Sequence, residues 1–398
     1  MAKSDRLNIA LVGAGGRGLG VRLPHILLMK DRFNLVAVCD VDGEKARQVA
    51  AEQGVRAYTR LQDLVKHERL DVAAISTPGD SHHAIGAYLA EQKVNLIVET
   101  PVAITLPTAD LLIDAVERNG VKLEVAEQYP RDPLHFMKRK VIDLGLIGGV
   151  LRVYSLFQTG GYHIVSSLRM MAGAEATRVT GVVMESPIPR VNASAVRQFT
   201  SEGWSMGLID FANGALAITA YSPLYHARAL GRKTKMLFQV DGATGAIVED
   251  DVHLTTEEQR LNGGRATVHP IRTVTRKVEE VDVLERLEIE TDPKVTWENP
   301  WPHYKIRPAG LAIVEEMDSL AQAVLNDRPT RYDARRGRAD QEVVIAWEES
   351  GRRDRTPIDL PLKGITGYEE ELHARFRERH GCDPMDVERL VDVFFPKV

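Results

Sequence analysis

A glycine-rich segment close to the start of the sequence has the spacing of a phosphate-binding loop. The segment reads Gly-Ala-Gly-Gly-Arg-Gly from position 13 and matches the pattern G-x-G-x-x-G. It follows an apolar run over 7–12, which predicts a buried strand, and it precedes a helical pattern. Glycines at this point permit a tight turn and close backbone approach to a pyrophosphate, and the helix N-terminus favours negative charge. We therefore predict a dinucleotide-binding loop formed by Gly13, Gly15, Gly16, Arg17 and Gly18.

An acidic residue further along the chain indicates which dinucleotide is bound. Asp40 ends the second predicted strand, 22 residues beyond Gly18. An acid at this place accepts hydrogen bonds from the adenosine ribose in NAD sites, and its charge would repel a 2′-phosphate. The next residue is Val41, not the Arg or Ser that would favour that phosphate. The predicted cofactor is therefore NAD.

His163, which directly follows Tyr162, is the best candidate for acid–base chemistry. Hydride removal from an alcohol needs a base for the hydroxyl proton, and imidazole suits this role at neutral pH. We expect His163 to be the catalytic acid/base, with Tyr162 assisting as a relay or acid, and both to contact the substrate. No metal site is expected, because neither H-E-x-x-H nor C-x-x-C occurs and the adjacent pair His82-His83 would point in different directions on a helix.

Strand and helix patterns alternate over the first third of the chain. This alternation predicts a doubly wound parallel sheet covered on both faces, in a domain at 1–126. The expected strands are 7–12, 35–39, 72–76, 95–99 and 122–126, and the expected helices are 21–30, 44–53, 61–67, 82–92 and 109–119.

The remainder, 127–398, is expected to form a second domain with a mostly antiparallel sheet, because strand-like segments there follow one another without intervening helices. These segments are 150–157, 177–184, 193–200, 204–211, 215–221 and 235–240. Helices are expected at 133–144, 310–325, 340–350, 369–380 and 385–394, and the charged stretch 251–300 gives no assignment.

Composition excludes several classes of protein. Of 398 residues, 44% are hydrophobic and 27% are charged, and the net charge of −5 argues against non-specific nucleic-acid binding. Two cysteines exclude a secreted disulfide scaffold. No apolar run is long enough to cross a membrane, and no secretory signal is evident. We expect a soluble cytoplasmic protein whose partner is a small molecule, not nucleic acid or membrane.

Further motifs occur in the order and spacing of a known family. They are Thr77-Pro78 with His82, Glu99-Thr100-Pro101, Glu127-Gln128, Gly145-Leu-Ile-Gly148, and Gly160 through Arg169 with Gly173. The series resembles the Gfo/Idh/MocA family of NAD(P)-dependent enzymes over about residues 5–220. The resemblance implies an N-terminal Rossmann domain, a C-terminal α/β domain with an open, mostly antiparallel sheet, and an active site between them. It also implies a homo-oligomer, dimer or tetramer, and a cofactor channel lined by Thr77, Pro78, His82, Glu99, Thr100 and Gln128.

Two departures from the family pattern bear on the reaction. Thr100 stands where the family has a lysine, and Thr159 stands where it often has an aspartate, four residues before His163. Lysine is also absent from a branch that resembles NAD-dependent glycoside hydrolases. There, transient oxidation at C3 permits elimination of the aglycone, water adds, and re-reduction regenerates NAD. We expect this redox-assisted cleavage of a glycoside. The alternatives are a net NAD-dependent sugar or cyclitol dehydrogenase and an NAD-binding sensor without catalysis.

Arginines indicate the charge of the substrate. Arg131 follows Glu127-Gln128, and Arg228 lies with Arg232 after a predicted strand. Guanidinium groups bind carboxylates and phosphates bidentately. We expect Arg131 and Arg228 to face the substrate, which would then be an anionic sugar.

Overall fold

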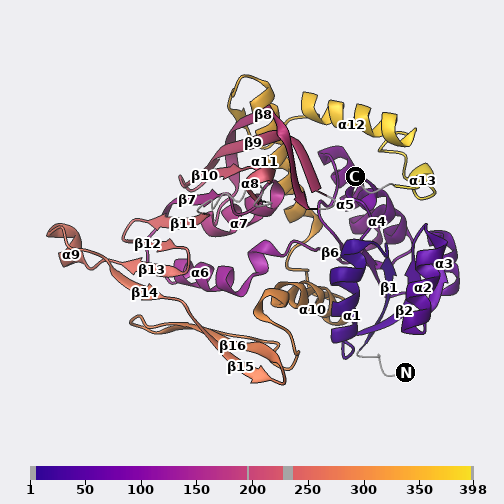
Figure 1. Cartoon of the computed structure of the whole chain (residues 1–398), viewed down its shortest axis with the longest axis horizontal. Helices are drawn as coiled ribbons and strands as arrows, with labels where there is room; N and C mark the ends of the chain where they lie inside the picture. Colours follow the sequence, from indigo (N-terminus) through magenta and orange to yellow (C-terminus); the bar gives the residue numbers. More distant parts are fainter. Residues whose placement is uncertain (1–5, 195–196, 227–235, 396–398) are drawn as a thin grey trace.

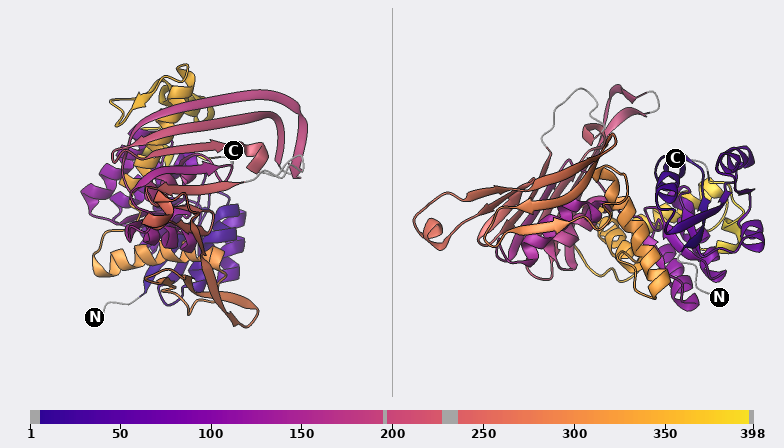
Figure 2. Two further views of the ribbon diagram at one scale, coloured as in Figure 1. Left: turned by 90° about the vertical axis from the view of Figure 1, so that its left-hand side faces the viewer. Right: turned by 90° about the horizontal axis from the view of Figure 1, so that it is seen from below.

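The computed structural model describes residues 6–194, 197–226 and 236–395. Two domains lie side by side, one built on a parallel sheet and one on a larger, mostly antiparallel sheet (Figures 1 and 2). None of the helices in these ranges is long and apolar enough to span a membrane.

The first domain has a Rossmann sheet whose described strands run in the order β3-β2-β1-β4-β5-β6, all parallel. The five expected strands are confirmed. The sixth, β3, is only three residues long, too short to give an apolar pattern. The bounds are β1 Leu7–Val12, β2 Phe33–Cys39, β3 Arg56–Tyr58, β4 Val72–Ile75, β5 Asn95–Val98 and β6 Leu123–Val125.

Helices cover both faces of this sheet. Helical structure begins inside the glycine loop, at Gly16, five residues earlier than expected, and a π-helical turn, Gly18–Arg22, leads directly into α1. The helix α5 also starts early, at Leu106, because Thr105 and Thr108 form a reciprocal capping box. The bounds are α1 Leu23–Leu28, α2 Gly43–Gln53, α3 Leu61–His67, α4 His82–Glu91 and α5 Leu106–Asn119.

The described part of the second domain contains a sheet with the order β14-β13-β12-β11-β7-β10-β9-β8-β18. Every neighbouring pair is antiparallel except β7 and β10, so the mostly antiparallel sheet is confirmed. The bounds are β7 Val150–Leu156, β8 Ala176–Ser194, β9 Arg197–Phe211, β10 Leu216–Tyr221, β11 Leu237–Gly242, β12 Gly245–Val248, β13 Asp251–Leu254, β14 Thr267–Pro270 and β18 Ile358–Asp359.

A long hairpin of β8 and β9 replaces three of the expected strands. The expectation of a separate strand at 193–200 was wrong, because β8 runs on to Ser194 and β9 starts at Arg197. Pro187 and Pro189 break the alternating pattern in the sequence, but the register between the two strands shifts after Pro187. A bulge of this kind accommodates proline within a strand.

The unassigned stretch 251–300 forms β13, β14, a short helix and a separate antiparallel sheet with the order β15-β16-β17. The helix α9 lies at the end of the molecule farthest from the Rossmann domain (Figures 1 and 2). The bounds are α9 Glu257–Leu261, β15 Arg272–Val278, β16 Val281–Ile289 and β17 Val295–Glu298.

Helices from the second half of the sequence also pack on the first domain. α10 contacts β5 and β6, and α13 contacts α4. The expected helices at 133–144, 310–325, 340–350 and 369–380 are present, and the fifth is much shorter than 385–394. The bounds are α6 Pro133–Asp143, α7 Tyr162–Ala172, α8 Pro223–His226, α10 Leu311–Asn326, α11 Ala334–Arg352, α12 Gly367–His380 and α13 Val387–Leu390.

Candidate functional site

The glycine loop is held between the ends of three strands. The backbone N–H of Gly13 donates to Cys39 O at 2.8 Å, at the end of β2. The next N–H, of Ala14, donates to Asp40 Oδ2 at 2.7 Å, and Asp42 N donates to Asp40 Oδ1 at 2.9 Å. Asp40 therefore stands at the carboxyl end of β2 beside the loop, where a bound dinucleotide places its adenosine ribose.

The three fingerprint glycines have different surroundings. A Cβ on Gly13 would lie 2.8 Å from the backbone of Ser76 and Thr77, and a Cβ on Gly18 would lie 2.1 Å from Gly13 O. These two glycines allow close packing of strand, loop and helix. A Cβ on Gly15 would instead enter open space, with nothing within 4 Å. This open position, at the N-terminal side of a helix, fits a pyrophosphate, so the residues present fit NAD.

Arg17 reaches from the loop across the ends of β5 and β6. Its Nε donates to Glu99 Oε2 at 2.9 Å and its guanidinium also donates to Gln128 Oε1 at 3.2 Å. Buried Arg22 donates to the other oxygen of Glu99 at 2.7 Å and lies 3.3 Å from Glu316 of α10. Burial opposes the charged form of Glu99, but the two guanidinium groups outweigh it, so its pKa lies below the ordinary value. Three predicted cofactor residues, Arg17, Glu99 and Gln128, are thus brought together.

His82 joins the two loops that follow β4 and β5. It is almost completely buried, and its ring nitrogens lie 2.7 Å from Pro101 O and 2.8 Å from Thr77 O. The Thr77 hydroxyl lies 2.7 Å from Ser81 Oγ. This arrangement fixes Thr77-Pro78 and Thr100-Pro101 as neighbours along the sheet edge. The ring of His82 itself is committed to backbone carbonyls, so its contribution to a cofactor channel is to position these loops.

A hydrogen bond between the two domains orients the imidazole of His163. His163, in the first turn of α7, has its Nδ1 2.8 Å from Glu127 Oε2, and Glu127 follows β6. Glu127 is completely buried, and its other oxygen accepts from Tyr129 N at 3.1 Å. The ring centroids of Tyr129 and Tyr162 lie 4.8 Å and 4.6 Å from that of His163. The carboxylate acceptor places the imidazole proton on Nδ1 and leaves Nε2 free to accept a proton.

Sequence reasoning missed the part played by Glu127. The motif Glu127-Gln128 was recognised, but only Gln128 received a role. The carboxylate usual four residues before the histidine is replaced by Thr159, which is buried. Glu127 supplies a carboxylate from another element, and the signal available in the sequence was an acid directly after a fully buried strand.

Tyr162 has a buried hydroxyl with no hydrogen-bond partner among the described residues. Burial raises its pKa well above the ordinary value, and the nearby carboxylates of Glu127, Glu99 and Asp340 raise it further. The hydroxyl therefore stays protonated and is available as a donor beside the imidazole. The pair predicted from sequence, Tyr162 and His163, lies together at the start of α7.

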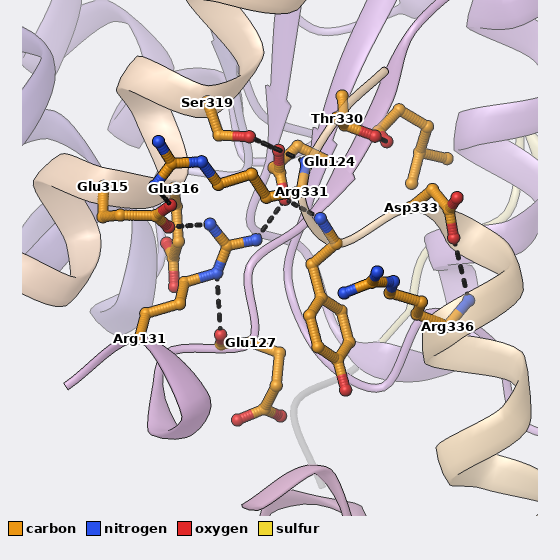
Figure 3. Close-up of polar contacts among 12 residues, drawn as sticks. Glu124, Glu127, Arg131, Glu315, Glu316, Ser319, Thr330, Arg331, Asp333 and Arg336 are labelled. Carbon is orange, nitrogen blue, oxygen red and sulfur yellow. Dashed lines mark hydrogen bonds and ion pairs between the residues drawn. The ribbon is translucent and has the colours of Figure 1, made fainter. Parts of the chain in front are cut away.

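The placement of Arg131 argues against the expectation that it faces a substrate. Its guanidinium is completely buried, and it donates to Glu124, to Glu315 and, at 3.1 Å, to Glu127 O (Figure 3). All three of its donor nitrogens are used in holding α10 against the end of β6. Arg228, the other arginine expected to bind substrate, lies outside the described residues. Within those residues, no group of three or more His, Cys, Asp or Glu could hold a metal ion.

Comparison with known proteins gives a family and several relatives. The family model described as "Oxidoreductase family, NAD-binding Rossmann fold" (GFO_IDH_MocA) matches residues 7–127. Inositol 2-dehydrogenase of Rubrobacter xylanophilus is 26% identical over 36% of this chain and 42% of its own length. A glycosyl hydrolase family 109 protein of Shewanella pealeana is 28% identical over 37% of this chain and 34% of its own length. The chain thus matches less than half the length of these two curated relatives.

Solved structures share the fold. The levoglucosan dehydrogenase complex with NADH and levoglucosan superposes with a TM-score of 0.66 at 20% identity. The superposition covers 90% of this chain and 100% of that structure. The two-domain arrangement, with a Rossmann domain and a mostly antiparallel sheet domain, is therefore shared over almost the whole chain.

Proposed function

From the match of residues 7–127 to the model of the Gfo/Idh/MocA oxidoreductase family, with its NAD-binding Rossmann fold, we propose that the protein is an NAD-dependent enzyme acting at a ring carbon of a sugar or glycoside. The observation that carries the proposal is the Glu127–His163 pair, with Nδ1 and Oε2 2.8 Å apart, beside the expected position of the nicotinamide. It supplies the base that alcohol oxidation requires.

The cofactor would be held by the glycine loop and Asp40 at one end, and by the residues following β4, β5 and β6 at the other. The open space at Gly15 receives the pyrophosphate, and Asp40 accepts the ribose hydroxyls. Thr77, Pro78, Glu99, Thr100 and Gln128 line the nicotinamide end. When bound, NAD supplies an acceptor for the hydride of the ring carbon.

His163 removes the proton of the reacting hydroxyl. Its free Nε2 accepts that proton, and the charge that forms on the imidazole is balanced by the buried carboxylate of Glu127. Tyr162 keeps its own proton and donates a hydrogen bond to the reacting oxygen. Thr100 contributes a hydroxyl but no charge, so in this proposal the acid–base work of the missing lysine passes to His163 and Tyr162.

The finer proposal is redox-neutral cleavage of a glycoside. A ketone at C3 makes the neighbouring C2–H acidic, so C2 loses a proton, the C1–O bond breaks, and the aglycone leaves as an alcohol. Water then adds across the C1–C2 double bond, and reduction of the C3 ketone restores the hydroxyl. The sum is glycoside plus water giving free sugar plus alcohol. The replacements at Thr100 and Thr159 and the similarity to glycosyl hydrolase family 109 proteins support this reaction.

A net sugar or cyclitol dehydrogenase is the second candidate. The similarity to inositol 2-dehydrogenase and to levoglucosan dehydrogenase favours it. The two candidates share the same base and the same cofactor, and they differ in whether NADH leaves the enzyme.

Retention of the cofactor separates these candidates. Native mass spectrometry and an ultraviolet spectrum of freshly desalted protein should show one NAD per chain if the cofactor is recycled in each turnover. Aryl glycosides should then release their aglycone without added NAD. Protein that emerges empty, together with steady NADH formation from a free sugar, would establish the dehydrogenase. If the protein shows neither activity, and a ligand response survives the substitution His163→Ala, the protein is an NAD-binding sensor without catalysis.

We also propose a homo-oligomer built on the outer face of the large sheet. Met184, Met206 and Leu208 are exposed there on adjacent strands β8 and β9. Light scattering coupled to size-exclusion chromatography should give the mass of a dimer or tetramer. The substitution Met206→Lys should reduce this mass, because it places a charge on the proposed interface.

A further inference from the structure

A groove lies against the active-site side of the β8–β9 hairpin. It has a volume of about 480 Å³, within the ~300–1,000 Å³ range of small-molecule sites. Its walls come from β8 and β9, from the end of β10, from α8 and from α11, elements that gather in one part of the second domain (Figure 1). None of its lining residues is among those proposed to hold the cofactor.

The groove reaches the residue directly before the catalytic pair. Gly161, the residue that precedes Tyr162 and His163, is part of its lining. A Cβ on Gly160 would lie 2.4 Å from the ring of Tyr221, so that ring packs closely against the loop that leads into α7. Tyr221 lines the groove as well. A molecule with one ring at His163 can therefore extend along Tyr221 into the groove.

The lining combines aromatic rings with hydroxyl and carboxylate groups. The aromatic members on the face of Ser205 are Phe199, Tyr221 and Trp347, and the polar members are Glu185, Ser201, Ser205 and Glu348. Aromatic faces pack against the apolar faces of sugar or aryl rings, and the hydroxyl and carboxylate groups can accept or donate hydrogen bonds at the rim.

The floor of the groove is rigid. Gly181 and Gly207 are paired across β8 and β9, and the indole of Trp347 fills the space that their side chains would occupy. Trp347 is almost completely buried, and its Nε1 has no hydrogen-bond partner among the described residues. A preformed wall of this kind binds a ring without the cost of ordering it first.

We propose that this groove binds the second ring, sugar or aryl, of a glycoside whose first ring is oxidised at His163. The inference rests on the proposed function and specifies its substrate class: a glycoside with a ring as its leaving group, not a free monosaccharide.

The test compares glycosides that share a first ring. For a panel of hexopyranosides, kcat/KM is measured for the methyl glycoside, the 4-nitrophenyl glycoside and a disaccharide with the same non-reducing sugar. In Ser205→Trp an indole fills the groove, so the ratio of kcat/KM for the 4-nitrophenyl to the methyl glycoside should fall at least tenfold. Because each variant is compared with itself, the better leaving ability of nitrophenol cancels.

Thr200→Trp is the matched control. Thr200 lies on the same strand as Ser205, points to the opposite face and is exposed, so the same indole should leave the ratio within twofold of the wild type. A second readout needs no turnover. The disaccharide should quench the tryptophan fluorescence of the NAD-loaded protein, through Trp347, in the wild type and Thr200→Trp but not in Ser205→Trp.

The outcomes separate the groove from the reaction. If Ser205→Trp and the wild type both turn over glycosides with the same ratio of kcat/KM, the groove does not bind the second ring, and the proposed function still holds. Quenching that Ser205→Trp abolishes, without turnover of any glycoside, would support the groove and reject the proposed function. If the disaccharide is preferred, the second ring is a sugar; if the nitrophenyl glycoside is preferred, it is aryl, and both results support the groove.

Discussion

Glu127 Oε2 lies 2.8 Å from Nδ1 of His163, and this contact joins the end of the Rossmann sheet to the start of α7 in the sheet domain. The carboxylate is completely buried, whereas the imidazole is about one-third exposed. The proton on Nδ1 is therefore held on the protein side, and Nε2 is left for the substrate. The arrangement follows the general design of a base oriented by a second, buried group.

The substitution Glu127→Gln tests this orientation. The amide can still accept from Tyr129 N, but its N–H₂ group would then face Nδ1 and force the imidazole proton onto Nε2. We expect kcat to fall by about 10²-fold or more, with KM changed much less. NAD affinity, measured by calorimetry, should stay within twofold of the wild type. A parallel loss of NAD affinity and melting temperature would show instead that Glu127 acts only in folding.

Gly15→Ala tests the fit of the loop to the pyrophosphate. The added Cβ would enter open space in the protein itself, so the melting temperature should hardly change. The same methyl group would occupy the place of the phosphate oxygens, and we expect NAD affinity to drop at least tenfold. Gly20→Ala is a matched control, because its Cβ also meets nothing within 4 Å but lies one helical turn farther on. If Gly15→Ala and Gly20→Ala change NAD affinity equally in titrations, Gly15 does not contact the pyrophosphate.

Asp40 should determine the preference for NAD. We expect Asp40→Ala to weaken NAD binding and to narrow the gap between NAD and NADP, because the repulsion of a 2′-phosphate is lost with the charge. Asp40→Asn keeps an acceptor for Ala14 N, so it should narrow the gap with less harm to the loop. Direct titration of both dinucleotides measures this. Unchanged NAD affinity in Asp40→Ala would place the ribose elsewhere.

Glu316 should make stability depend on pH. Burial raises its pKa from 4.5 to about 8, although Arg22 and Arg131 oppose this. The folded protein therefore keeps a proton that the unfolded chain releases. The stability from this group is complete below pH 4.5 and is lost as the pH rises through 8. Because Gln does not ionise, the melting temperature of Glu316→Gln relative to the wild type should increase between pH 5 and pH 8.5. Each ~1 kcal/mol shifts it by about 2–4 °C.

An exposed carboxylate serves as the control for that measurement. The side chain of Glu280 is almost fully exposed, so Glu280→Gln should show no such trend across the same pH range. A difference between Glu316→Gln and the wild type that is constant or declines with pH would mean that Glu316 is ionised in the folded protein.

Local patterns in the sequence were enough to predict the Rossmann sheet and its loop. Continuous buried runs such as Val72–Ile75 and the spacing of the glycines report on neighbours in the chain, so they can be read from the sequence directly. The pairing of Glu127 with His163 could not be, because it depends on how α7 packs against the end of β6. The burial of Arg131 was hidden for the same reason: its partners Glu315 and Glu124 come from different elements. An arginine near a motif looks the same in the sequence whether it faces a substrate or a buried acid.

The contacts of α12 and of the segment that follows it have a consequence for synthesis on the ribosome. His373 Nε2 lies 2.8 Å from Thr105 Oγ1, Glu369 accepts from Leu106 N at the start of α5, and Pro384 O lies 2.7 Å from His83 Nε2. The Rossmann domain is translated first, yet the start of α5 and one side of α4 gain these partners more than 250 residues later. In the nascent Rossmann domain, the start of α5 and one side of α4 therefore stay uncovered until the whole sheet domain has been translated. Its late completion makes the order of translation part of how this protein reaches its native state.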